Sequence, residues 1–358
     1  MTPAAYALVN LAAVKHNIGK IRDYAPQAKI MAVIKANAYG HGLLRIAEVL
    51  QGVDAIAVAR ADEGIRLRLS GFSIRIVILE GFVCKQELED LIKYDLDVVV
   101  HSVGQVDIIE NYWGQKKLTV WLKLDTGMNR LGFKSTEFTP IYKRLMACSS
   151  VKQPFFLMTH LSSADDPHSA VTRQQVNLFK DIVKTYPGEK SIANSAGIIA
   201  WDDSLTDWVR PGVMLYGVSP FSNSLGKDFG LKPVMSLHSR LIAIKNIGAG
   251  EVVGYAGTWV SNQQTRLGVV AIGYGDGFPR SAQTGTPVLV NGKRVPLVGR
   301  VSMDMITVDL SSQMNAKAGD PVTLWGEGLE VEEIARYSDT IPYTLLCGIT
   351  QRVEIKKV

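Results

Sequence analysis

The stretch KIMAVIKANAYGHG, residues 29–42, begins as an apolar, β-branched run and ends in a turn of small residues. Its apolar part, residues 30–34, has the continuous character of a strand that is buried on both faces. A stretch with helical spacing, LLRIAEVLQG at residues 43–52, follows directly. A buried strand, a short turn and a helix form the repeating unit of parallel α/β folds, so this stretch predicts the first such unit.

The same unit recurs along the next part of the chain. Each candidate strand is an apolar run that ends in small or polar residues, and most lead into a helical stretch. The further strand candidates are DAIAVAR (54–60), IRIVILEGF (74–82), LDVVVHS (96–102), LTVWLKLDTGMNRLGF (118–133), FFLMTHLSSAD (155–165), KSIANSAG (190–197) and WVRPGVMLYG (208–217). Eight units within about 200 residues predict a closed (β/α)8 barrel of the TIM type rather than an open sheet.

The pattern changes near residue 231. Helical stretches become scarce, and short alternating or glycine-punctuated runs such as RLGVVAIGYGDGF and MITVDL take their place. Asn291–Gly292 is a hairpin signal, and EVEEIARYSD at 330–339 is the one helix expected. The sequence thus predicts a barrel domain at 1–231 and a mostly antiparallel β domain at 232–358. The extreme N-terminal strand is a candidate for pairing with the second domain.

Composition excludes several classes of function. The chain has 358 residues, 47% hydrophobic and 20% charged, as in ordinary globular proteins. Its net charge of +5 comes from 39 basic and 34 acidic residues that are scattered along the sequence. Tight basic pairs occur at Lys116–Lys117 and Lys356–Lys357, which are too short to form a stripe for nucleic acid. We therefore expect a small-molecule partner and no nucleic acid.

Cysteine usage and hydropathy indicate the compartment. An odd number of widely spaced cysteines favours free thiols in a reducing environment, and these are Cys84, Cys148 and Cys347. The N-terminal stretch MTPAAYALVNLAAVKHN lacks a basic region before its short apolar run, and no run approaches the ~18 apolar residues of a membrane span. We expect a cytoplasmic protein with no membrane partner.

Lys35 stands at the carboxyl end of the first predicted strand. Barrel enzymes place their chemistry at this face, and a desolvated lysine there has a lowered pKa and can attack a carbonyl. The alternative is a lysine that extends its ammonium to water from a strand end.

The seventh and eighth units predict an anion site. Ser195 in ANSAG can donate a hydroxyl, and Gly212 in VRPGVMLYG lets backbone approach a ligand closely. Barrels commonly bind phosphate at these two units. Pro211–Gly212 as a simple turn is the alternative. A strand-end lysine together with a phosphate site fits pyridoxal phosphate, which has an aldehyde and a phosphate.

Arg210 lies where a cofactor held by its phosphate would bring its ring nitrogen. An arginine there donates a hydrogen bond and keeps that nitrogen unprotonated, which weakens the ring as an electron sink. His160, at the end of the sixth unit, is a candidate to orient Arg210 or the ring. Arg210 as an ordinary ion-pair partner is the alternative.

The fifth unit, KLDTGMNRLGF, adds Lys123, Asp125 and Arg130. Arg130 has the two-pronged geometry that binds a carboxylate, and the alternative is an internal Lys–Asp–Arg network. A metal site that joins His160 to Asp165, Asp166 and His168 lacks a recognised ligand spacing, so no metal is expected. In the β domain, Tyr255, Tyr274 and the pair Met303–Asp304 are equally consistent with core or turn positions.

Seven motifs together resemble those of the bacterial alanine racemases. They run in order, with compatible spacing, from about residue 4 to the C-terminus: VIKANAYGHG, LKLDTGMNRLGF, NSAG, WVRPGVMLYG, VGYAGTW, GYGDGFPR and RVSMDM. The resemblance implies a PLP-dependent racemase that interconverts L- and D-alanine in a homodimer with shared sites. It also implies a role in D-alanine supply for peptidoglycan or in alanine catabolism.

The resemblance assigns roles to particular residues. Lys35 would be the cofactor lysine and the base for D-alanine, and Tyr255 of the other subunit would be the base for L-alanine. Arg210, backed by His160, would meet the ring nitrogen, and Arg130 the phenolic oxygen and the substrate carboxylate. The phosphate would be held by a set of five residues: Tyr39, Ser195, Gly212, Val213 and Tyr343.

Further positions follow from the same resemblance. The Met303 backbone would bind the substrate carboxylate, and Tyr274 with Asp304 would line the entrance of the partner's site. Lys123 matches a lysine that is carbamylated in some members. Gly275 and Val213 differ from the commoner alanine and isoleucine by small apolar changes.

Three other functions share part of these features. A broad-specificity or serine racemase would share every motif but need a wider entrance. A PLP-dependent decarboxylase of similar architecture would favour an acidic residue in the place of Arg210. A non-catalytic PLP-binding protein would resemble the barrel alone.

Overall fold

The computed structural model describes residues 4–358, so the first three residues of the N-terminal stretch considered above lie outside it. The chain forms two compact units. The barrel unit comprises Ile18–Ala38 and Gly42–Leu215. The β unit comprises the chain up to Asn17, Tyr39–His41 and Tyr216–Val358. A domain boundary at 231/232 stays a prediction.

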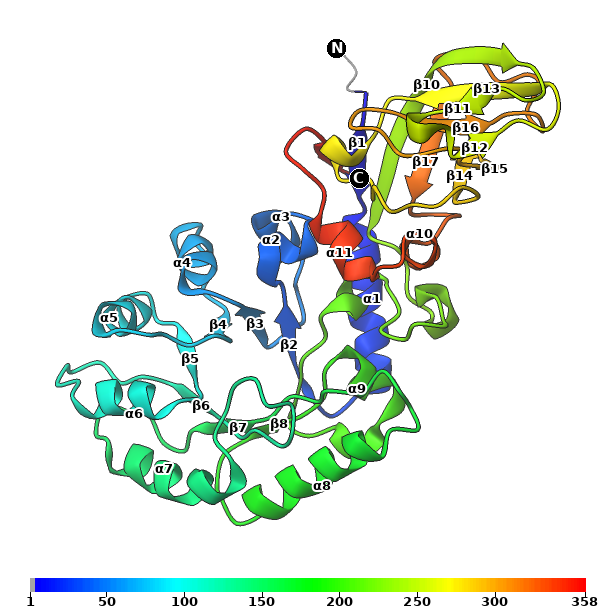
Figure 1. Ribbon diagram of the computed structural model, residues 1–358. Helices are drawn as coiled ribbons and strands as arrows, with labels where there is room; N and C mark the ends of the chain where they lie inside the picture. Colours follow the sequence, from blue (N-terminus) through cyan, green and yellow to red (C-terminus); the bar gives the residue numbers. More distant parts are fainter. Residues whose placement is uncertain (1–3) are drawn as a thin grey trace. The chain divides into compact units, whose positions relative to one another are not determined.

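The barrel unit contains eight parallel strands that close on themselves, as the sequence predicts (Figure 1). Closure occurs where the first strand pairs with the last, through Lys29 opposite Trp208 and Ile30 opposite Val209. The strands are β2 (Lys29–Val33), β3 (Ala55–Val58), β4 (Arg75–Ile78), β5 (Asp97–Val100), β6 (Val120–Lys123), β7 (Phe156–Met158), β8 (Lys190–Ser191) and β9 (Trp208–Val209).

Helices follow the strands around the barrel. They are α3 (Leu43–Ala47), α4 (Ala61–Leu69), α5 (Lys85–Lys93), α6 (Val103–Glu110), α7 (Ser135–Ala147), α8 (Ala170–Val183) and α9 (Ser195–Ala200), with a 3-10 turn η1 (Asp202–Ser204). The helix after the first strand is shorter than the sequence suggests, because α3 ends at Ala47. Helix α1 (Leu11–Tyr24) and the turn α2 (Lys35–Tyr39) each contain residues of both units.

Aromatic side chains fill the barrel at the amino ends of its strands. Trp121 stacks on Phe156 with ring centroids 4.2 Å apart and meets Trp208 edge-on at 5.4 Å. The Trp121 indole donates a hydrogen bond of 3.1 Å to the buried Asp97 carboxylate, which also faces Arg75 at 3.4 Å. This packing closes one end of the barrel and leaves the chemistry to the carboxyl ends of the strands.

The β unit is built around a mostly antiparallel sheet of eight strands. Its central strand β10 pairs with β1, β13 and β17, and β1 also pairs in parallel with β18. The strands are β1 (Tyr6–Val9), β10 (Met235–Ile247), β13 (Thr265–Val270), β14 (Pro287–Val290), β15 (Lys293–Pro296), β16 (Ile306–Asp309), β17 (Pro321–Trp325) and β18 (Glu354–Lys357). A separate ribbon pairs β11 (Val252–Val253) with β12 (Trp259–Val260).

Local signals explain the turns of the β unit. Asn291 and Gly292 both have positive φ, at 51° and 74°, and join β14 to β15 as the hairpin signal predicts. The expected helix is α10 (Val331–Tyr337). A second helix, α11 (Pro342–Cys347), was missed, since six residues are too few for a clear period. Three short 3-10 turns also belong to the unit: η3 (Gly226–Phe229), η4 (Tyr255–Gly257) and η5 (Tyr274–Asp276). A further 3-10 turn, η2 (Val213–Tyr216), begins in the barrel unit and ends at the first residue of this part of the β unit.

Two expectations from composition can be compared with the structure. All three cysteines are free thiols, as their number and spacing predict. Within residues 4–358, none of the helices combines the length and the apolar character that crossing a bilayer requires.

Candidate active site

The carboxyl ends of the barrel strands bring several cations together. Lys35 follows β2, Lys123 is the last residue of β6, and Arg210 follows β9. The charges of Lys35, Arg210 and Arg130 all act on Lys123, so these side chains lie near it. The sequence predicted each of these residues at a strand end, and the barrel places them at one face of the unit.

Burial and charge change the protonation of Lys123. Burial, followed by the positive charges of Arg210, Arg130 and Lys35, lowers its pKa to about 8, and Asp125 opposes the shift only in part. Near physiological pH, Lys123 is therefore a neutral amine in a substantial fraction of the molecules. Such an amine can act as a nucleophile, which an ordinary surface lysine cannot do.

Arg210 is buried and hydrogen-bonded to residues at the ends of β7 and β8. Its guanidinium donates to Ser191 Oγ at 2.5 Å, to the carbonyl of Thr159 at 2.6 Å and to that of Ile192 at 3.1 Å. Burial lowers its pKa to about 10, so it remains charged at neutral pH. These bonds hold the cation in one orientation inside the barrel mouth.

His160 is held neutral beside Arg210. Burial, then Arg210 and Lys123, lower its pKa well below the usual value. Arg210 Nη2 lies 3.3 Å from His160 Nδ1, and an arginine can only donate. Nδ1 is therefore the acceptor, and Nε2 carries the ring proton.

Lys35 is followed by a turn of left-handed helix. Four residues in a row, Ala36–Tyr39, have φ between 51° and 56°, although none is glycine. Each such residue costs roughly 1–2 kcal/mol relative to the right-handed form, so the surroundings must hold the turn in place. The Asn37 amide donates to Glu63 at 3.3 Å, and the Asn37 side chain accepts from the Leu43 amide at 2.9 Å. Backbone strain of this kind is concentrated at functional sites, which fits the predicted role of Lys35.

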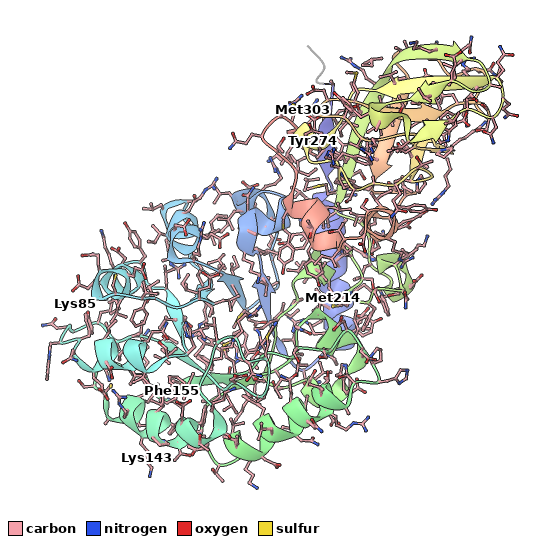
Figure 2. The ribbon with its side chains drawn as sticks, viewed as in Figure 1. Lys85, Lys143, Phe155, Met214, Tyr274 and Met303 are labelled. Carbon is pink, nitrogen blue, oxygen red and sulfur yellow. The ribbon has the colours of Figure 1, made fainter. Side chains whose placement is uncertain are left out.

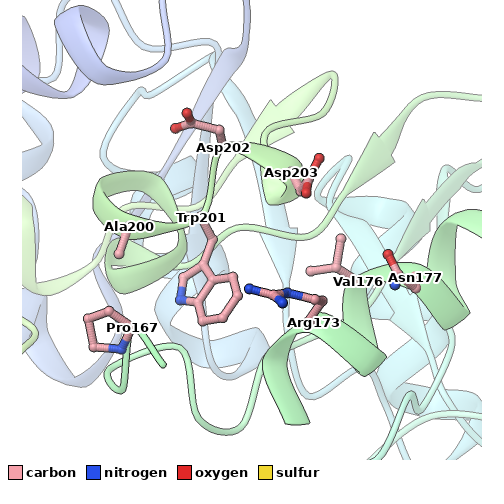
Figure 3. Close-up of a pocket in the computed structure, with 8 residues that line it drawn as sticks. All are labelled: Pro167, Arg173, Val176, Asn177, Ala200, Trp201, Asp202 and Asp203. Atoms are coloured by element: carbon pink, nitrogen blue, oxygen red, sulfur yellow. The ribbon is translucent and has the colours of Figure 1, made fainter. Parts of the chain in front are cut away.

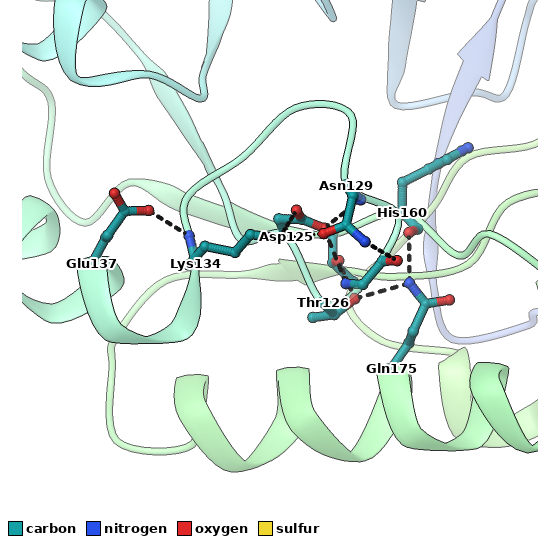
Figure 4. A network of polar contacts seen from close by, with 9 residues as sticks. Asp125, Thr126, Asn129, Lys134, Glu137, His160 and Gln175 are labelled. Carbon is teal, nitrogen blue, oxygen red and sulfur yellow. Dashed lines mark hydrogen bonds and ion pairs between the residues drawn. The ribbon is translucent and has the colours of Figure 1, made fainter.

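Asp125 organises the loop that carries Arg130. Its Oδ1 accepts from the backbone amides of Gly127 and Asn129, each at 3.0 Å, and its Oδ2 accepts from Lys134 at 2.7 Å. Lys134 also contacts the Asn129 side chain. Figure 4 shows these contacts. The carboxylate is thus used in shaping the loop, which leaves an excess of positive charge in the barrel mouth.

Ser195 and Gly212 lie together, at the ends of the last two strands. Ser195 Oγ accepts from the Gly212 amide at 2.9 Å and from the Met214 amide at 3.4 Å. Val213 lies between these two amides in the chain and is buried. The residues predicted to bind an anion thus lie together, with the Ser195 hydroxyl beside two backbone amides.

The donor set of the barrel unit fits a phosphorylated aldehyde. Four cationic side chains lie near one another here, and the Asp125 carboxylate is already hydrogen-bonded to its own loop. An anionic ligand would therefore balance the charge. Ser195 is the acceptor in its bonds from the Gly212 and Met214 amides, so its O–H can donate to a phosphate oxygen, and Gly212 lets the backbone approach closely. Lys35, beside the strained turn, supplies an amine for an aldehyde.

In the β unit, Tyr39 packs against two further tyrosines. Its ring centroid lies 4.7 Å from that of Tyr216 and 5.9 Å from that of Tyr343. Burial, with smaller contributions from Tyr343 and Cys347, raises the pKa of Tyr39, so its phenol stays protonated and can donate a hydrogen bond. A side chain at Gly40 would meet the Leu346 carbonyl at 2.1 Å, so glycine is required where the backbone approaches α11.

Tyr274 and Met303 lie beside each other in the β unit (Figure 2). The Tyr274 amide donates to the Ser302 carbonyl at 3.1 Å, and the Gly275 amide donates to the Met303 carbonyl at 2.8 Å. Arg352 bridges Asp304 at 2.8 Å and Asp276 at 3.2 Å. These contacts fix the backbone around Met303–Asp304.

The remaining predicted residue of the β unit, Tyr255, begins η4 and is 68% exposed. Met303 is also 52% exposed. Side chains of this size at the surface of one chain are available to a neighbouring molecule.

A second feature of the barrel unit lies away from these residues. A surface pocket between α8 and α9 is lined by Pro167, Arg173, Trp201 and Asp203, among others (Figure 3). It contains none of the site residues named from the sequence. In the part of the chain that the structure describes, no group of three or more His, Cys, Asp or Glu side chains is arranged to hold a metal ion.

Four residues that hold the site in shape were not singled out in the sequence. They are Glu63, Lys134, Gln175 and Arg352. Each acts through a contact to a loop or turn that carries a site residue. No spacing or motif in the sequence signals such contacts, because they depend on how helices and loops come together in space.

Family models cover nearly the whole chain. Residues 9–220 match "Alanine racemase, N-terminal domain", and residues 234–357 match "Alanine racemase, C-terminal domain". The alanine racemase of Aeromonas hydrophila is 52% identical over 355 residues, covering 99% of each chain. A biosynthetic alanine racemase of Escherichia coli O6:H1 is 50% identical over 356 residues, again covering 99% of each chain.

Solved structures agree with these matches. Biosynthetic alanine racemase from Pseudomonas aeruginosa superposes with a TM-score of 0.97 at 40% identity, covering 100% of both chains. Alanine racemase from Bartonella henselae with covalently bound pyridoxal phosphate gives a TM-score of 0.88 at 28% identity, covering 99% of both chains. Fold and relatives together define the class as barrel-type PLP-dependent racemases. Within this class, the chain belongs to the alanine racemase family.

Proposed function

We propose that this protein is an alanine racemase that interconverts L- and D-alanine with pyridoxal phosphate as cofactor. One observation supports the proposal most strongly. Lys35, which precedes the strained turn, lies in the same group of cations as the buried Arg210 at the carboxyl ends of the barrel strands. Relatives that are named alanine racemase, at about 50% identity over the full chain, support the same reaction.

Several residues would hold the cofactor. Ser195, Gly212 and Val213 of the barrel unit would bind the phosphate, together with the phenols of Tyr39 and Tyr343. Arg210 would donate to the ring nitrogen, and the neutral His160 would keep Arg210 in place. Arg130 would meet the phenolic oxygen. When bound, pyridoxal phosphate supplies an aldehyde for covalent attachment of an amine and a conjugated ring that acidifies the α-proton of the substrate.

Racemisation needs a base on each face of the substrate. Lys35 Nζ would take the α-proton of D-alanine, and Tyr255 Oη, from a second copy of the chain, would take that of L-alanine. A single base would tend to return the proton to the face from which it came. Arg130 and the Met303 backbone would orient the substrate carboxylate, and Tyr274 with Asp304 would line the entrance.

The two-base scheme also requires a particular assembly. A homodimer with shared sites would use the exposed Tyr255 and Met303 of each chain in the site of the other. We place the enzyme in the cytoplasm, where it would supply D-alanine for peptidoglycan or serve alanine catabolism.

The first test combines spectroscopy with turnover. Purified protein should show an absorbance band near ~420 nm from the lysine-bound cofactor, and borohydride should abolish both the band and the activity. Turnover of L- and D-alanine should proceed in both directions. Protein without this band after incubation with pyridoxal phosphate would refute the proposal.

A second test separates the two bases. Tyr255→Phe should lose α-proton exchange from L-alanine while exchange from D-alanine persists, because Lys35 remains. Equal loss from both enantiomers would argue against separate bases. Parallel kinetics with alanine, serine and lysine distinguish an alanine racemase from a broad-specificity or serine racemase, which would turn over the larger substrates as well.

A further inference from the structure

We propose that Gln175, on the outer helix α8, is a positioning residue that holds the loops carrying Arg130 and His160 in a fixed arrangement. The inference rests on the proposed function, because it concerns residues that would contact cofactor and substrate. All the residues involved belong to the barrel unit, and Figure 4 shows Gln175 with its partners Thr126 and His160.

The Gln175 amide is buried and makes contacts with both loops. The side chain is only 1% exposed. Nε2 donates to Thr126 Oγ1 at 3.3 Å, in the loop after β6, and to the His160 carbonyl at 3.4 Å, in the loop after β7. Oε1 accepts from the backbone amide of Ser162 at 2.9 Å and from its hydroxyl at 3.1 Å. One side chain thus joins two neighbouring loops.

These contacts continue to the residues of the site. Thr126 Oγ1 lies 2.8 Å from Thr159 Oγ1, and the Thr159 carbonyl accepts the 2.6 Å hydrogen bond from Arg210. The loop that begins at Asp125 and Thr126 carries Arg130. Arg130 and His160 therefore lie in the loops that Gln175 contacts, and Arg210 is hydrogen-bonded to the residue before His160. A shift of about 1 Å in such groups is enough to impair an active site severely.

The chemistry of the contacts requires an amide. Gln175 acts as donor toward one pair of groups and as acceptor toward another. Leucine would fill the space but leave four polar groups without this partner in a buried position, which costs free energy. Ionised glutamate would keep the contacts to Ser162 but could not donate to Thr126 or to the His160 carbonyl.

Gln105 on α6 provides a matched control in the same barrel. It is 2% exposed, donates to the Phe82 carbonyl at 3.0 Å and accepts from the His101 amide at 2.7 Å. It therefore joins the loops after β4 and β5 in the way that Gln175 joins those after β6 and β7. No residue proposed for the site lies in the loops that Gln105 joins.

The first measurement is hydrogen–deuterium exchange on the full chain. In Gln175→Leu, amide exchange should increase in peptides covering residues 125–133 and 160–163 and stay unchanged in residues 80–84. Gln105→Leu should give the opposite pattern. If Gln175→Leu leaves exchange at 125–133 and 160–163 unchanged, the inference is wrong, whatever the enzyme's activity.

The second measurement compares kinetics with cofactor binding. For Gln175→Leu and Gln175→Glu we expect KM for alanine to rise at least about fivefold, with weaker binding of pyridoxal phosphate to the apoprotein. Gln105→Leu should lower the melting temperature while leaving KM and cofactor affinity near the wild-type values. Thr126→Val should resemble Gln175→Leu, and Thr126→Ser, which keeps the hydroxyl, should restore KM.

The outcomes separate this inference from the proposed function. Wild-type protein that neither binds pyridoxal phosphate nor racemises alanine would refute the proposed function, and the exchange experiment would still test Gln175. Active wild-type enzyme with equal kinetic effects of Gln175→Leu and Gln105→Leu would show that Gln175 acts only through general stability. That result would overturn the inference.

Discussion

The protonation states of Lys123 and His160 depend on the residues around them. Lys123 has a pKa of about 8 because it is buried among Arg210, Arg130 and Lys35. His160 stays neutral for the same reasons. An isolated lysine or histidine would have neither property, so the residue type alone does not determine the reactivity.

The lowered pKa of Lys123 leads to a testable prediction, that CO2 can modify this side chain. The neutral amine can add CO2 to give a carbamate and a released proton, and the new negative charge would offset the surrounding cations. Removal of CO2 should lower activity, and bicarbonate should restore it. Because the neutral amine forms above the lowered pKa, restoration should be more complete at pH 8.5 than at pH 6.5, as judged by turnover at about those two pH values. Lys123→Met should show no response to bicarbonate, and an equal response would contradict the assignment.

Asp97 should make stability depend on pH. Burial raises its pKa from 3.8 to about 6, so the folded protein binds the proton more tightly than the unfolded chain. Stability should therefore fall as the pH rises from about 4 to 6, by up to about 3 kcal/mol from this group. Asp97→Asn keeps an acceptor for Trp121 and should remove this contribution.

Melting temperatures across this pH range measure the effect. At pH 7.5, Asp97→Asn should melt at the same temperature as wild type or higher. A variant that melts several degrees lower, with the wild-type pH dependence, would show that the ion pair with Arg75 outweighs the cost of burial.

At the scale of elements, the left-handed turn after β2 is the feature that departs from ordinary backbone preferences. It places Lys35 at its start and Tyr39 at its end within a single turn. Two hydrogen bonds stabilise it: the Asn37 amide donates to Glu63, and the Asn37 side chain accepts from the Leu43 amide. The apolar strand could be predicted from the sequence, but the handedness of the turn could not, since Ala36 and Ala38 favour right-handed conformations.

Substitutions at the exposed Ala36 test this strain. Ala36→Val should lower the free energy of unfolding by about 1–2 kcal/mol, because a β-branched residue is poorly tolerated at positive φ. Ala36→Gly removes the steric cost and should leave stability unchanged or slightly higher, since its greater unfolded-state entropy offsets part of the gain. Denaturant titration measures both changes. A valine variant as stable as wild type would show that the turn is not strained.

At the scale of the whole molecule, the proposed enzyme needs two copies of the chain. Lys35 belongs to the barrel unit, whereas Tyr255 is exposed on the β unit. If each site combines Lys35 of one subunit with Tyr255 of the other, defects in the two residues should complement each other in a mixed dimer.

Co-expression of Lys35→Ala with Tyr255→Phe tests this arrangement. A mixed dimer would contain one intact site and one doubly defective site. With random pairing, the mixture should recover about a quarter of the wild-type activity, assayed from L- to D-alanine. Activity no higher than that of Tyr255→Phe alone would indicate that each site lies within one subunit.

The sequence by itself determined the eight-unit barrel, the β domain with its Asn291–Gly292 hairpin, and the strand-end positions of Lys35, Lys123 and Arg210. Periodicity and turn chemistry are local, so they can be read along the chain. Tertiary structure decided the lowered pKa of Lys123, the left-handed turn and the link from Gln175 to two loops. These depend on burial and on contacts between residues far apart in sequence, which no local pattern records.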